Sequence, residues 1–147
     1  MKKQIVGFYV IGLFFLIATG HLPAADYSDN GDSTVTQNTT GLVWQQLEGG
    51  SHTWEAALAY CETLVLGGNS DWRLPNHKEL HSLIDYSDTS PPVIDSLFSS
   101  ANSNYYWTST TKSNDLDMAW LGYFNTGGIF TSSKTNSYPV RCVRGGL

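Results

Sequence analysis

Apolar side chains in the middle of the chain recur at helical spacing along HTWEAALAYCETLVLGG. The positions on the shared face are Trp54, Ala57, Leu58, Cys61, Leu64 and Val65. Thr53 is a residue type that caps helix N-termini, and Gly67 and Gly68 are typical of helix ends. The pattern predicts a helix between Thr53 and Gly67 that has Cys61 on its buried face.

A second helix is predicted within NHKELHSLI. Asn76 and Glu79 have the spacing of a capping box, in which each side chain binds the other residue's backbone N–H. The apolar stripe that follows consists of Leu80, Leu83 and Ile84. His77 and His81 are four residues apart, which suits a metal ion, but the His-Glu-x-x-His order is absent. We expect both histidines to be exposed polar residues.

The segment before this helix, DWRLP, has the pattern of a rigid corner. Trp72 and Leu74 alternate with Arg73, so one face is apolar, and Pro75 favours an extended backbone at Leu74. Asp71 and Arg73 are expected to pair with each other or to bind backbone groups. A catalytic or ligand-binding cluster is the alternative interpretation of the same residues.

Alternating and β-branched residues predict strands on both sides of the helices. Thr34–Gln37 and Leu42–Gln46 form an early hairpin around the turn at 38–41, and the turn-forming sequence DNGD precedes them. Asp29 and Asp32 in DNGD lack the later glycine and glutamate of an EF-hand loop, so a turn is expected there.

The last third of the chain is rich in Ser, Thr, Asn, Gly and aromatic residues. YYWTST, MAWLGYF, GGIFTSS and PVRCVRG are predicted strands, NTGG is a hairpin turn, and Ile94–Phe98 is one helical turn. The order of these elements predicts an α+β domain with an early hairpin, two helices and an antiparallel meander.

Residues 1–25 have the pattern of a secretory signal peptide. Lys2 and Lys3 precede the apolar run 5–17, and small residues follow it. Cleavage after Gly20 fits the small-x-small rule better than cleavage after Ala25. An uncleaved membrane anchor is the alternative, although the apolar run is short for a full span. The expected product is a secreted or periplasmic domain, 26–147, without stable membrane insertion.

Charge narrows the choice of partners. Removal of Lys2 and Lys3 leaves six basic and thirteen acidic residues, a formal charge of −7. An acidic chain disfavours nucleic acid and other polyanions, so no nucleic-acid partner is expected.

Cys61 and Cys142 are the two cysteines of the chain. An even number of cysteines in an exported protein indicates a disulfide, which would close a loop of about 80 residues. A thiol nucleophile or a metal ligand is the alternative, but no Cys-x-x-Cys or Cys/His spacing supports it. We expect no cofactor and no metal.

The motifs together resemble the Lcl C-terminal-like domain family of bacteria. The residues that carry the resemblance are DNGDSTVTQNTTGLVWQQ, TWEAALAYC, SDWRLPNHKEL, YYWTSTT, AW and VRCVRGG, which span nearly all of 26–147. The family is named after the terminal domain of a collagen-like adhesin that binds sulfated glycosaminoglycans, and most of its members have no assigned activity.

The layout is also similar to the C-type lectin-like fold, which includes the formylglycine-generating enzymes. This resemblance implies two helices packed on antiparallel strands, terminal strands that lie close together, and a disulfide from the first helix to the last strand. The calcium-binding lectin motifs Glu-Pro-Asn, Gln-Pro-Asp and Trp-Asn-Asp are absent, and so are a second cysteine pair and a collagen-like repeat.

The function expected from these observations is an exported, non-catalytic module that binds carbohydrate or a surface protein. The candidate ligand-binding residues are Asn114, Asp115 and Asp117, in a predicted loop, and the aromatic Trp107, Trp120 and Tyr123. At least half of the six aromatic residues Tyr105, Tyr106, Trp107, Trp120, Tyr123 and Phe124 are expected to face the core instead. The alternatives are an assembly domain of an envelope complex, which includes a homo-oligomer, and an enzyme of the formylglycine-generating type.

Overall fold

The computed structural model describes residues 26–87, 90–98 and 105–146. The predicted α+β architecture is confirmed. The helices are α1 (Trp54–Thr63) and α2 (His77–His81). The strands are β1 (Tyr27–Asp29), β2 (Thr34–Gln37), β3 (Val43–Gln45), β4 (Ser51–His52), β5 (Tyr105–Lys112), β6 (Asp115–Tyr123), β7 (Gly128–Ser133), β8 (Tyr138–Pro139) and β9 (Val143–Arg144).

The first sheet joins the two ends of the domain. Its strands lie in the antiparallel order β1-β2-β3-β9, so the last strand pairs with the third. The early hairpin is the predicted one, with Val35 opposite Trp44. Strand β1 was not predicted, because the acids and glycine of DNGD dominate the local pattern.

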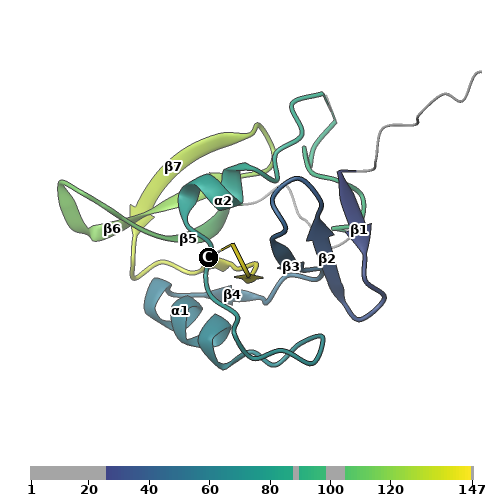
Figure 1. Cartoon of the computed structure of the whole chain (residues 1–147). Coiled ribbons are helices and arrows are strands. Elements are labelled where there is room, and N and C mark those ends of the chain that lie inside the picture. The colour runs from purple at the N-terminus through teal and green to yellow at the C-terminus, as the bar shows by residue number, and fades with distance from the viewer. Residues whose placement is uncertain (1–25, 88–89, 99–104, 147) are drawn as a thin grey trace, which may run out of the picture.

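The second sheet is the meander β5-β6-β7, and β4 and β8 form a separate short antiparallel pair. Figure 1 shows the two larger sheets on opposite sides of the molecule, with α2 between them and α1 below. The predicted closing strand is divided into β8 and β9, because residues 140–142 leave the strand conformation.

Helix α1 is shorter than predicted. Leu64 has an extended backbone with ψ of 131°, so the helix ends at Thr63, before the two glycines. Val65 therefore leaves the helical face and is 71% exposed, which contradicts its predicted burial. Thr53 is the N-cap residue, as predicted, but its side chain makes no capping hydrogen bond.

The capping box of α2 is confirmed. The Asn76 side chain accepts hydrogen bonds from the N–H groups of Lys78 and Glu79, and the Glu79 carboxylate accepts one from Asn76 N–H at 2.8 Å. The helix has only five residues, so the buried Leu83 and Ile84 lie beyond its end. The Ile94–Phe98 segment forms an isolated bridge and a turn rather than a helical turn.

The corner before α2 has different ion pairs from those expected. Arg73 donates two hydrogen bonds to Glu79, at 2.7 and 2.8 Å, and one to the carbonyl of Gly145. Asp71 pairs instead with Arg144, at 2.6 Å. The backbone of Arg73 forms a bridge with Val143. These contacts therefore hold β9 against the segment that leads into α2.

Two groups of buried residues form the core. One lies between the first sheet and α2, around Trp44, Leu80 and Tyr106. The other lies between α1 and the second sheet, around Trp72 and Trp107, and it contains the predicted disulfide. Cys61 on α1 and Cys142 directly before β9 are joined across 81 residues. The bond holds α1 against the closing segment.

The N-terminal residues 1–25, including the predicted signal peptide, lie outside the described residues. Among the described residues, no helix has the length and apolar character needed to span a bilayer.

Candidate functional site

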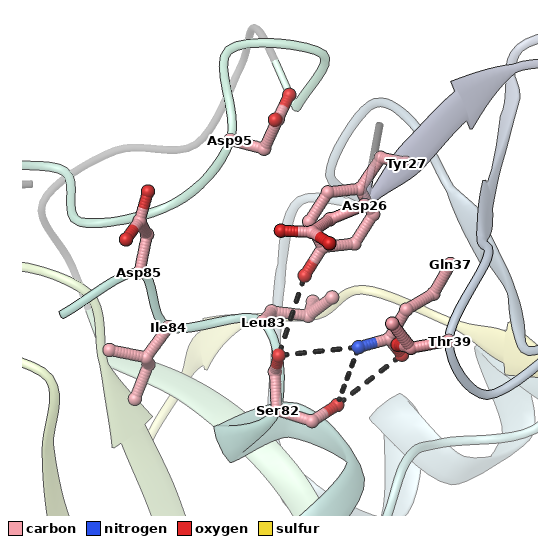
Figure 2. Close-up of a pocket in the computed structure, with 9 residues that line it drawn as sticks. All are labelled: Asp26, Tyr27, Gln37, Thr39, Ser82, Leu83, Ile84, Asp85 and Asp95. Carbon is pink, nitrogen blue, oxygen red and sulfur yellow. Dashed lines mark hydrogen bonds between the residues drawn. The ribbon is translucent and has the colours of Figure 1, made fainter. Parts of the chain in front are cut away.

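A pocket of about 240 Å³ lies between the start of the domain and the segment that follows α2. Figure 2 shows Asp26, Tyr27, Gln37 and Thr39 facing Asp85 and Asp95 across it, with Ser82, Leu83 and Ile84 at its base. The residues come from β1, the end of β2, the turn after β2, the exit of α2 and the loop before Phe98.

A hydrogen-bond network fixes the floor of the pocket. The phenol of Tyr27 donates to the carbonyl of Ser82 at 3.4 Å, and the amide of Gln37 donates to the same carbonyl at 3.3 Å. The Gln37 amide oxygen in turn accepts hydrogen bonds from Thr40 and from the indole of Trp44. Gln37 is buried, so its donor and acceptor positions are held in place.

Two of the acidic residues are oriented by turns. Asp85 accepts hydrogen bonds from the N–H and hydroxyl of Ser87, and Asp95 accepts one from the N–H of Leu97 at 2.8 Å. These local turns help to set the direction of each carboxylate. The ring of Tyr27 packs edge-to-face against Phe98, with ring centroids 5.4 Å apart, so the aromatic wall is also fixed.

The pocket is strongly negative. Three carboxylates line it, and none of the described lining residues is Lys, Arg or His. Burial, and then the charges of Asp95, Asp26 and Asp85, raise the pKa of Tyr27 to about 12, although a hydrogen bond with Gln37 opposes the shift. The phenol therefore stays protonated and acts as a donor at neutral pH.

This arrangement suits a small ligand with many donor groups. Carboxylates and carbonyls accept hydrogen bonds from hydroxyl or ammonium groups, and charged acceptors give the stronger bonds. The volume lies below the roughly 300 to 1,000 Å³ of sites for drug-sized ligands, so one sugar ring or one side chain fits. The same charges repel sulfate and carboxylate groups.

Of the predicted ligand-binding residues, Trp107 is fully buried, so its predicted contact with a ligand is wrong. Its indole donates to the carbonyl of His52 at 2.8 Å, and its ring packs against Tyr138. Tyr106 and Phe124 are also fully buried. Three of the six aromatic residues Tyr105, Tyr106, Trp107, Trp120, Tyr123 and Phe124 are therefore buried, which confirms that at least half of them belong to the core.

The predicted acidic loop is a strand. Asp115 and Asp117 are exposed residues at the start of β6, and Asn114 lies in the tight turn before it. A hairpin, rather than a loop, forms because Lys112 pairs directly with Asp115. The three residues are together at the hairpin tip, far along the strand from Tyr123, so their ligand role stays a prediction separate from the pocket.

Trp120 and Tyr123 lie apart from one another. They are separated by an odd number of strand positions and so face opposite sides of β6. Trp120 lies near His77, with ring centroids 6.2 Å apart, whereas Tyr123 stacks on Tyr105 at 4.2 Å. The structure does not combine them into one aromatic site.

The two histidines of α2 have partners of their own. The Nε2 atom of His81 is 2.7 Å from the hydroxyl oxygen of Tyr86, and the backbone N–H of His77 donates a hydrogen bond to the hydroxyl of Thr110. Among the described residues, no group of three His, Cys, Asp or Glu side chains has the geometry to hold a metal ion.

Sequence reasoning missed the pocket. Its residues come from four segments, each of which looks like an ordinary turn or strand end, and only tertiary packing brings them together. The one usable signal was the local excess of Asp next to turn residues around positions 26, 85 and 95.

A protein-family model matches most of the chain. Residues 33–144 match the model of the Lcl C-terminal domain, which covers most of the chain, from just before β2 to the end of β9. No curated protein matches the chain. The chain belongs to the Lcl C-terminal domain family.

Proposed function

We propose that the chain is an exported, non-catalytic binding module that takes one neutral or amine-bearing sugar residue into the pocket beside Tyr27. The observation that carries the proposal is the combination of a fixed aromatic wall with three carboxylates in a small concavity. Sugar hydroxyls need several acceptors at fixed positions, and an amino group adds a favourable charge interaction with Asp26, Asp85 and Asp95.

The charge of the pocket argues for a ligand different from that of the adhesin after which the family is named. Sulfated glycosaminoglycans carry anionic groups that the pocket carboxylates repel. The chain as a whole is also acidic, with a formal charge of −5 including its two N-terminal lysines. We therefore place this member among binders of neutral or basic glycans, and a lysine side chain of a surface protein is the second ligand that the same chemistry accepts.

Export and the lectin-like fold are part of the proposal. The pattern of residues 1–25 supports export, and the Cys61–Cys142 disulfide is consistent with an oxidising compartment. The pairing of β3 with β9 and the bond from α1 to the closing segment are the features that support a C-type lectin-like fold.

The test is a glycan-array screen of the purified, oxidised protein against neutral, amine-bearing and sulfated glycans. We expect saturable binding to amine-bearing glycans first and to neutral glycans second, and no binding to sulfated ones. Binding confined to sulfated glycans would overturn the ligand class. If no glycan binds and lysine-rich peptides are captured, the ligand of the pocket is a protein rather than a sugar.

A further inference from the structure

The polypeptide enters the domain at the wall of the acidic pocket. Asp26, the first described residue, lines the pocket, and its carbonyl accepts a hydrogen bond of 2.9 Å from the backbone N–H of Asn38. Figure 2 shows Asp26 next to the ring of Tyr27, with Asp85 and Asp95 on the opposite side. The chain that precedes Asp26 is therefore attached directly to the rim of the pocket.

The pocket carries a negative charge that its described walls do not balance. Asp26, Asp85 and Asp95 line it, and none of the described lining residues is Lys, Arg or His. The three charges converge on one place, because, after burial, they are the causes that raise the pKa of Tyr27 to about 12. Three neighbouring carboxylates favour a cation as their ligand.

The basic side chains of the described residues lie elsewhere. Arg73 and Arg144 form ion pairs at the corner before α2, and Arg141 is fully buried in the core. Lys134 lies over the ring of Trp54, 3.9 Å from its centroid. A cation for the pocket therefore has to come from outside the described part of the chain.

Cleavage of the expected signal peptide creates such a cation at this place. Hydrolysis of the peptide bond after Gly20 leaves a carboxylate on the removed segment and an amine on His21. The amine is protonated at neutral pH, because the ordinary pKa of an α-amine is about 7.8. The residues 21–25 then join this ammonium to Asp26, over a span of at most roughly 17 Å. Cleavage after Ala25 places the ammonium on Asp26 itself, so either cut brings it within reach of the pocket.

We propose that the N-terminal ammonium of the mature chain occupies the pocket beside Tyr27, and that a sugar must displace it in order to bind. The inference rests on the export and the binding site of the proposed function. A short tether gives the ammonium an effective concentration in the millimolar range, so even a weak contact with the carboxylates fills the pocket much of the time. The apparent affinity for an external ligand is then reduced by the fraction of pockets that are empty.

The test measures the pKa of the α-amine in the oxidised protein after export and cleavage. Mass spectrometry first identifies the N-terminal residue, which we expect between His21 and Asp26. Reductive methylation with isotope-labelled formaldehyde then marks the amine without removing its charge, and the NMR shift of the label follows its protonation. We expect the α-amine pKa to be at least about 1 higher in the folded protein than in the urea-unfolded protein, because the carboxylates stabilise the ammonium. A chain that keeps Met1 as its N-terminus, or an α-amine pKa that is the same in both states, overturns the proposal.

Two double variants separate the pocket from a general effect of charge. Asp85→Asn with Asp95→Asn removes two carboxylates that are distant from the N-terminus in sequence, and the asparagine oxygens keep the local turn hydrogen bonds. This variant should lower the α-amine pKa toward its value in the unfolded chain. The matched control, Asp115→Asn with Asp117→Asn at the β6 hairpin tip, makes the same change in net charge and should leave the α-amine pKa raised. Equal effects of the two variants would contradict occupancy of the pocket.

A glucosamine oligosaccharide distinguishes this inference from the proposed function. At saturation it should displace the N-terminus, so the α-amine pKa should fall to its value in the unfolded chain. If the oligosaccharide binds but the α-amine pKa is ordinary without it, or stays raised with it, the inference fails and the proposed function stands. A raised α-amine pKa that the pocket variant abolishes, in a protein that binds no glycan, would confirm the N-terminus as the occupant and refute the proposed function.

Discussion

Tyr27 and Ser82 lie 55 residues apart in the sequence, and the phenol of Tyr27 donates a hydrogen bond of 3.4 Å to the carbonyl of Ser82. This bond joins the first strand to the exit of α2. It also fixes an aromatic ring beside three carboxylates, which is the feature on which the proposed binding function rests.

The protonation of Tyr27 gives a prediction at alkaline pH. Its pKa is raised from 10.0 to about 12, so the folded chain keeps a proton that the unfolded chain loses between these values. Linkage then makes the free energy of unfolding fall as pH rises through this window. Tyr27→Phe should abolish this part of the fall. The difference between the phenolate absorbance titrations of wild type and variant should show one group that titrates near 12. A difference curve centred near 10 would contradict the described burial of the phenol.

The Arg73–Glu79 pair predicts the effect of a mutation at the corner. Glu79→Ala removes two hydrogen bonds from Arg73 and half of the capping box, so we expect the free energy of unfolding to fall by about 2 kcal/mol. Urea unfolding measures the change. Glu62→Ala, at an exposed acid of α1, is the matched control and should have little effect. Equal stability of the two variants would show that the corner contributes nothing.

The same pair gives an acid dependence. Burial raises the pKa of Glu79. The hydrogen bonds from Arg73 and Asn76 and the charge of Arg73 together lower it by more, so the pKa of Glu79 lies below its ordinary value of 4.5. The stabilisation by ionised Glu79 is therefore fully present above pH 4.5. It is lost as the pH falls through the lower pKa that Glu79 has in the folded chain. The difference in stability between wild type and Glu79→Gln should shrink on acidification. A difference in stability that grows on acidification would show that folding raises the pKa of Glu79 instead of lowering it.

The disulfide predicts the largest single effect. It closes a loop with a sequence separation of 81, for which the chain-entropy model gives about 4.5 kcal/mol. Cys61→Ala with Cys142→Ala should lower the free energy of unfolding by that amount, and a reducing agent should then have no further effect. Both sulfur atoms lie in the core, so alanine is the appropriate replacement. A loss below about 1 kcal/mol would mean that the unfolded chain is already constrained there.

The features that sequence predicted are those set by neighbouring residues. The capping box of Asn76 and Glu79 needs only a spacing of three, and the early hairpin needs only β-branched residues around a turn. The disulfide followed because two cysteines allow one pairing. The fold class followed from the order of these elements.

The features that sequence missed depend on distant packing. Helix α1 ends at Thr63 although its apolar pattern continues to Val65, because Leu64 turns into an extended backbone. Trp107 is an aromatic residue in a polar segment, yet its strand faces α1 and the disulfide, which bury it. Asp71 and Arg73 are close in sequence but take partners elsewhere, because β9 lies beside the corner.

The most direct test of the pocket as the binding site is a calorimetric titration with a glucosamine oligosaccharide. Two double variants are compared with wild type: Asp26→Asn with Asp95→Asn in the pocket, and Asp115→Asn with Asp117→Asn at the β6 hairpin tip. Asparagine keeps the turn bond of Asp95 to Leu97, so the shape is preserved. We expect the pocket variant to bind at least about tenfold more weakly, and the hairpin-tip variant to bind like wild type. Unchanged affinity in the pocket variant, with loss in the hairpin-tip variant, would contradict this expectation.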